Sequence, residues 1–64
     1  MKKFGQELLK FRAKNDLTQR QVADIIGVGV VMVSRYETGV SEPTSRNKIR
    51  FANKLTKWEE NKNV

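Results

Sequence analysis

Basic side chains outnumber acidic ones in this sequence, and they are its main groups for binding a charged partner. The sequence has 13 Lys and Arg against 7 Asp and Glu, which leaves a net charge of +6 in 64 residues. Residues 44–57 contain no acidic residue and five basic ones, namely Arg46, Lys48, Arg50, Lys54 and Lys57. Such a density of positive charge favours polyanionic partners, nucleic acid among them. A basic surface that is merely solvated is the alternative that charge alone leaves open.

Catalytic side chains are scarce. The sequence contains no histidine and no cysteine, and its acidic residues are scattered. A metal site needs a cluster of such ligands, and covalent catalysis needs a nucleophile beside a base. We therefore expect no enzymatic activity, no metal or other cofactor, and no small-molecule ligand.

No segment of the sequence predicts export or a membrane anchor. The start MKKFGQELLK is basic, but Gln6 and Glu7 interrupt the apolar stretch that a signal peptide requires. No stretch approaches the ~20 apolar residues of a membrane-spanning helix. We therefore expect no membrane partner and a cytoplasmic location.

The first predicted element is an amphipathic helix over residues 3–14. Its apolar residues recur at helical spacing, at Phe4, Leu8 and Phe11. Asn15 and Asp16 follow, and both residue types tolerate the left-handed backbone at which helices often stop. The helix is therefore expected to end there.

A second helix is predicted to begin at Thr18. Thr18 and Gln21 have the spacing of a capping box, in which each side chain bonds a free backbone N–H at the helix start. Gly27 stands where a helix of this length needs a left-handed stop. The predicted inward stripe consists of Val22, Ala23 and Ile26.

The run GVGVVMV, residues 27–33, contains no polar side chain. Valine favours strands, but a lone strand has no sheet partner and no second strand-like segment exists to pair with it. A third helix over residues 30–38, bounded by Gly39, is the better interpretation. Its predicted contribution to the core, together with the turn before it, is Val28, Val33 and Tyr36.

A fourth helix is predicted after Gly39, with Pro43 in its first turn. Its expected inward stripe is Ile49, Ala52 and Leu55. From about residue 59 to 64 the chain has little apolar content and is expected to fray.

The segment LTQRQVADIIGVGVVMVSRYETG, residues 17–39, resembles the helix-turn-helix of the Cro and lambda-repressor-type DNA-binding family. GVG is similar to the family's turn, VSRYETG to the end of its recognition helix, and PTSRNKIRFANKL to its fourth helix. The resemblance implies one all-α domain over residues 1–64, lambda-repressor-like, with four to five helices and a helix-turn-helix core at about residues 18–38. It implies that the third helix enters the DNA major groove, generally as a dimer on a two-fold operator.

Projection of residues 30–38 onto a helix places a candidate base-reading set on its outer side: Val30, Val31, Ser34 and Arg35. The two valines depart from the polar residues that the family usually carries there. Their methyl groups can pack against the C5-methyl of thymine. The alternatives are that one valine covers the core or contacts a second subunit. Arg35 can grip guanine O6 and N7 with its planar fork, or else contact a phosphate.

Contacts to the DNA backbone are implied at the starts of two helices. By resemblance, Gln19 clamps a phosphate at the start of the second helix, where free N–H groups and the helix dipole favour an anion. A solvated helix-start residue is the alternative. Further candidates for backbone contact are Arg20, Thr38, Thr44 and Arg46.

The resemblance also implies an ion pair between Arg12 and Glu37. Such a half-buried pair can contribute little net stability, so its expected role is to hold the recognition helix at its angle. Two independent surface charges are the alternative.

The fourth helix departs from the family at Ser45 and Lys48, where leucine-like residues are usual. Either Lys48 extends outward along its apolar stem, or the helix begins later and packs more loosely. The apolar candidates for a dimer contact are Phe51, Leu55 and Trp58, the alternative for Trp58 being a place over the monomer core.

The predicted function is a sequence-specific regulator of transcription, expected to be a repressor that binds a pseudo-palindromic double-stranded operator as a homodimer. The length resembles that of small Cro-type phage repressors, although the DNA-binding domain of a longer repressor would look the same. The expected site of action is the cytoplasm of a bacterium or a phage-infected host. The alternative is a protein-interaction module of antitoxin or antirepressor type, in which the surface of Val30 and Val31 binds a protein.

Overall fold

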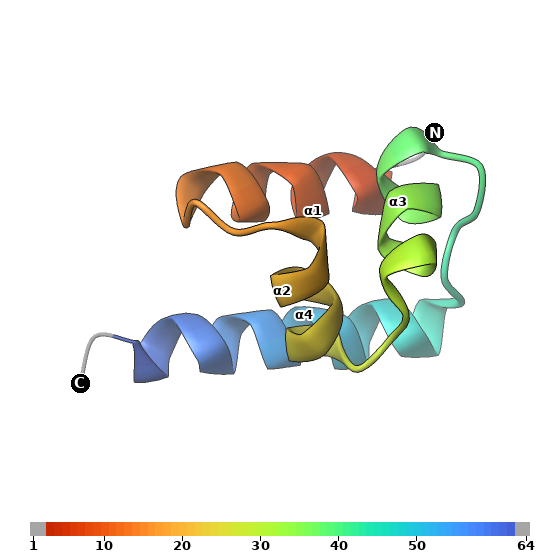
Figure 1. Ribbon diagram of the computed structural model, residues 1–64. Coiled ribbons are helices and arrows are strands. Elements are labelled where there is room, and N and C mark those ends of the chain that lie inside the picture. The colour runs from red at the N-terminus through yellow and green to blue at the C-terminus, as the bar shows by residue number, and fades with distance from the viewer. Residues whose placement is uncertain (1–2, 63–64) are drawn as a thin grey trace.

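A computed structural model describes residues 3–62 of the chain. Four helices make up this part: α1 (Lys3–Lys14), α2 (Gln19–Ile26), α3 (Val30–Thr38) and α4 (Ser45–Asn61). No strand occurs between residues 3 and 62, so the predicted all-α class and the helical interpretation of residues 30–38 are confirmed. In Figure 1, α1 and α4 lie on opposite sides of the short α2, and α3 crosses at one end. α3 packs against both α1 and α2, and α2 packs against α4.

The end of α1 and both ends of α2 are where local sequence placed them. α1 stops before Asp16, whose φ of 56° is left-handed, and α2 stops at Gly27, whose φ is 81°. The capping box at the start of α2 is complete. Gln21 N donates to Thr18 Oγ1 at 3.1 Å, and Thr18 N donates to Gln21 Oε1 at 2.8 Å. Because these signals act within a few residues, they are independent of the rest of the fold.

The core lies where the four helices meet. Three aromatic rings pack together at its centre, with centroids 5.7 Å apart for Phe4 and Tyr36, 6.0 Å for Phe4 and Phe51, and 6.2 Å for Tyr36 and Phe51. Around them the aliphatic members of the core are Leu8, Val22, Ala23, Ile26 and Val33. Val28 is only partly buried but packs against this cluster.

The fourth helix begins later than Pro43 and turns a different face inward. Thr44 is its N-cap, with Oγ1 accepting from Asn47 N at 3.2 Å, so Pro43 precedes the helix. Ile49 is 64% exposed, whereas Phe51 is 6% exposed. The inward stripe predicted from Ile49, Ala52 and Leu55 is therefore wrong for its first two members, which are exposed, and only Leu55 packs against the core. The large ring of Phe51 has more apolar area to bury than Ile49, and it finds two rings to pack on.

The end of α4 returns to the end of α1. Trp58 packs edge-on against Phe11 with ring centroids 5.8 Å apart. Asn15 Nδ2 donates to Glu59 Oε2 at 3.3 Å, and Lys14 forms an ion pair with the same carboxylate at 3.2 Å. These contacts, the Asn15 hydrogen bond first, lower the pKa of Glu59. The helix extends to Asn61, past residue 59, where fraying was predicted to begin, and residues 63 and 64 of that predicted tail lie outside the described residues.

Candidate nucleic-acid interface

The turn between α2 and α3 consists of three residues and is held by the backbone of α2. The N–H groups of Gly27 and Val28 both donate to the carbonyl of Ala23, at 2.8 and 3.0 Å. Ala23 is 2% exposed, as the crossing point of two close helices requires. With Val22 and Val33 fully buried on either side, α2 and α3 form one rigid unit.

The outward side of α3 carries the predicted base-reading residues. Val31 is 61% exposed and Val30 is 37% exposed, both in the first turn of the helix. Arg35 is exposed one turn further on, and Ser34 between them is half-buried. Val33 and Tyr36 face the core from the opposite side. The run GVGVVMV thus comprises the turn and the first four residues of α3, and those four divide between a core side and an open side.

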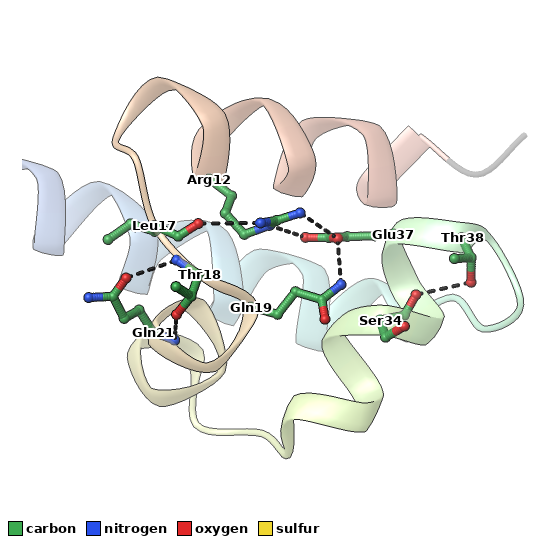
Figure 2. Close-up of polar contacts among 8 residues, drawn as sticks. All are labelled: Arg12, Leu17, Thr18, Gln19, Gln21, Ser34, Glu37 and Thr38. Atoms are coloured by element: carbon green, nitrogen blue, oxygen red, sulfur yellow. Dashed lines mark hydrogen bonds and ion pairs between the residues drawn. The ribbon is translucent and has the colours of Figure 1, made fainter.

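Glu37 joins three helices through its carboxylate. Arg12 Nε on α1 donates to Oε2 at 2.8 Å, and Arg12 Nη2 donates to Oε1 at 3.2 Å, so the predicted ion pair is present. Gln19 Nε2 on α2 donates to the same Oε1 at 3.0 Å. Figure 2 shows the Arg12 and Gln19 side chains both reaching the Glu37 carboxylate. The Glu37 side chain is only 6% exposed.

Sequence reasoning missed the contact between Gln19 and Glu37. It treated Gln19 as a side chain available to a phosphate, whereas one amide N–H is bound to Glu37. No spacing rule links two residues on different helices. Arg12 Nη1 also donates to Leu17 O at 3.3 Å, which ties the segment before α2 to the same group of side chains.

The two threonines among the predicted backbone contacts differ in what they can donate. Thr38 Oγ1 donates to Ser34 O at 3.0 Å within its own helix (Figure 2), so a phosphate contact requires its hydroxyl to turn away. Thr44 Oγ1 instead accepts a hydrogen bond as the N-cap of α4, which leaves its hydroxyl proton to donate elsewhere. The two arginines of the set, Arg20 and Arg46, are exposed.

Two lysines of the basic segment have partners within the protein. Lys48 Nζ forms an ion pair with Glu42 at 2.7 Å, so its charge is partly compensated, and its side chain is 40% exposed. Lys54 Nζ donates to Ile26 O at 3.5 Å, where a cation stabilises the carbonyl end of α2. Neither role follows from helical periodicity, because both partners lie in other segments. The remaining basic residues of the segment, all exposed, are Arg46, Arg50 and Lys57.

The residues predicted to form a dimer contact pack against other parts of the same monomer. Phe51 is part of the core, Leu55 packs against it, and Trp58 packs on Phe11. An open groove of about 490 Å³ lies between α1 and α4, and its apolar lining is Phe4, Leu8, Phe11, Ile49, Ala52 and Leu55.

The part of the chain that the structure describes contains neither a metal-binding cluster nor a helix suited to a membrane. Over residues 3–62, no three His, Cys, Asp or Glu side chains are grouped so that they could hold a metal ion. None of the four described helices combines the length and apolar character needed to cross a bilayer.

The chain matches the model of a known protein family. A family model described as helix-turn-helix matches residues 8–57, which include all of α2 and α3 and most of α1 and α4. No curated protein and no solved structure matches the chain.

Proposed function

The chain belongs to the Cro and lambda-repressor-type helix-turn-helix family of DNA-binding regulators, and on that premise we propose that it represses transcription from a specific operator. In this proposal α3 enters the major groove, and two copies bind the two halves of a pseudo-palindromic site. The site of action is then the cytoplasm of a bacterium or of a phage-infected host.

The observation that carries the proposal is the two-sided character of α3. Val33 and Tyr36 hold it against the core, while Val31 and Arg35 stand outward on a helix narrow enough for the major groove. Val30 and Val31 offer methyl groups to thymine, and Arg35 offers a planar fork to guanine. Ser34, which is half-buried beside them, completes the proposed base-reading set.

Phosphate contacts are proposed on both sides of this helix. Gln19 and Arg20 lie at the start of α2, and Thr44 and Arg46 lie at the start of α4. Backbone N–H groups at helix starts favour anions, and the two arginines add full charges. Thr38 joins the set only when its hydroxyl leaves the carbonyl of Ser34.

The proposed dimer follows from the geometry of DNA. A single small helix-turn-helix module reads one half-site, and a two-fold pair reads two half-sites one helical turn apart. Since Phe51 and Trp58 are used in the monomer, we place association of the two copies on the operator itself.

Selection of bound sequences from a random pool of duplexes tests the proposal. The expected result is a palindrome with half-sites ~34 Å apart, and binding that weakens with salt at a slope of roughly −0.9 in log K per neutralised phosphate. If no sequence is enriched and affinity for duplexes is flat with salt, DNA is not the partner. The protein-interaction module then takes the place of the repressor.

A further inference from the structure

The carboxylate of Glu37 lies at the contact between the helix that is proposed to read bases and the helix that is proposed to grip a phosphate. It accepts three hydrogen bonds, two from Arg12 and one from Gln19. Its near-complete burial, at 6% exposure, keeps these bonds out of competition with water. The position of the Gln19 side chain therefore depends on a residue of another helix.

A carboxylate fixes the orientation of an amide beside it. A carboxylate has no hydrogen to donate and only accepts hydrogen bonds. Glu37 therefore pairs with the amide nitrogen of Gln19, and the amide oxygen points away. An amide nitrogen carries two N–H donors, and Glu37 Oε1 uses one of them. The second N–H belongs to the first residue of α2, the end of the helix at which backbone N–H groups favour an anion.

Arg12 removes the electrostatic obstacle to this arrangement. An uncompensated carboxylate close to a DNA phosphate would repel it. The guanidinium of Arg12 forms an ion pair with both oxygens of Glu37, so the pair presents no net negative charge. A carboxylate can then orient the amide without opposing an anion.

We propose that Glu37 is a positioning residue for DNA binding, which holds the Gln19 amide ready to donate its second N–H to a phosphate, and that Arg12 neutralises Glu37 for this purpose. The inference rests on the proposed function and deepens it. Glu37 does not touch DNA in this arrangement. Because Glu37 holds the Gln19 side chain in place before DNA binds, less side-chain conformational entropy is lost on binding.

A double-mutant cycle in Gln19 and Glu37 tests the coupling. Glu37→Gln is suitable because it replaces one acceptor oxygen with an NH2 group. That group cannot accept a hydrogen bond from Arg12 or Gln19. The probes are the duplex selected from the random pool and a random-sequence duplex. We expect Glu37→Gln to lower affinity about tenfold for both, Gln19→Ala to do the same, and the double variant to lose no more than either.

The readouts separate positioning from a change in the angle of α3. Loss of one phosphate contact weakens all duplexes alike and leaves base preference unchanged. A displaced α3 would instead reduce the preference for the selected sequence. Urea unfolding establishes that each variant is folded under the assay conditions, and Glu37→Met is the second variant if Glu37→Gln does not fold. Glu60→Gln is the control. It makes the same change in net charge at an exposed position of α4 and is expected to retain affinity.

Additive losses in the cycle, or a Glu37→Gln effect confined to the selected sequence, would overturn the positioning role. These outcomes differ from failure of the proposed function itself, in which the unsubstituted chain binds neither duplex. Arg12→Ala provides an independent check. It should weaken binding more than Glu37→Gln, because it leaves a bare carboxylate, and adding Glu37→Gln should restore part of the loss.

Discussion

Gly5 on α1 lies directly against the backbone of Tyr36 on α3. A Cβ atom on Gly5 would stand 1.9 Å from the carbonyl oxygen of Tyr36 and 2.9 Å from its carbonyl carbon. Backbone cannot move aside as a flexible side chain can, so the distance between α1 and α3 depends on the missing side chain. The edge-on contact of Phe4 with Tyr36, with centroids 5.7 Å apart, adjoins this crossing.

Gly5→Ala is therefore expected to destabilise the protein, although alanine is the better helix former. Forcing one extra carbon into a packed site costs about 1–3 kcal/mol. Urea unfolding, followed by the fluorescence of Trp58, measures the change. Gln6→Ala on the exposed side of the same helix is the control and is expected to have little effect. An equal or higher free energy of unfolding for Gly5→Ala would contradict this close packing.

Val31→Ser is expected to weaken binding only at particular A·T pairs. Each buried methyl-sized group contributes about 0.8 kcal/mol, so loss of two from a thymine contact lowers affinity about tenfold. Binding to a set of single-base operator variants measures this. Val40→Ser, at a more exposed valine outside α3, should leave the profile unchanged. A uniform loss over all variants for Val31→Ser, or none, would argue against thymine contact.

Arg35→Lys separates base reading from phosphate binding, because it keeps the charge and removes the planar fork. If Arg35 grips a guanine, discrimination at one G·C pair is expected to fall by about 1–3 kcal/mol while the salt slope stays the same. Titrations over a range of salt with matched and mismatched operators measure both quantities. Retained discrimination, with a lower salt slope for Arg35→Ala, would assign the residue to a phosphate.

Trp58→Ala is expected to destabilise the monomer rather than dissociate a dimer. The ring packs on Phe11 and is half-buried, so the loss should be about 2 kcal/mol, below the range for a fully buried aromatic. Chemical unfolding followed by circular dichroism measures it, with Ile49→Ala at an exposed site as the control. A shift from dimer to monomer in sedimentation on Trp58→Ala would contradict this.

The lowered pKa of Glu59 predicts a pH dependence. Its stabilising contact with Asn15 and Lys14 is present above the ordinary carboxyl pKa and is lost as pH falls through the lowered pKa of the folded state. Glu59→Gln should therefore reduce stability at neutral pH and have no effect in acid. The measurement is the midpoint of urea unfolding as a function of pH. If Glu59→Gln differs from the unsubstituted chain by the same amount at every pH, the contact is ruled out.

The sequence by itself determined the features that depend on neighbours within one or two helical turns. The pair Thr18 and Gln21 set the start of α2, and the left-handed residues Asp16 and Gly27 set two helix ends. The division of α3 into a core side with Val33 and an open side with Val31 follows from helical geometry alone. For the same reason the all-α class and most of the candidate interface were predictable.

Only the tertiary structure decided which residues meet across helices. Phe51 rather than Ile49 turns inward because the rings of Phe4 and Tyr36 lie there to receive it. The closeness of Gly5 to α3, and the capture of Gln19 by Glu37, depend on the distance and angle between separate helices. Periodicity gives the side of a helix on which a residue lies, but the packing of whole helices determines what that side contacts.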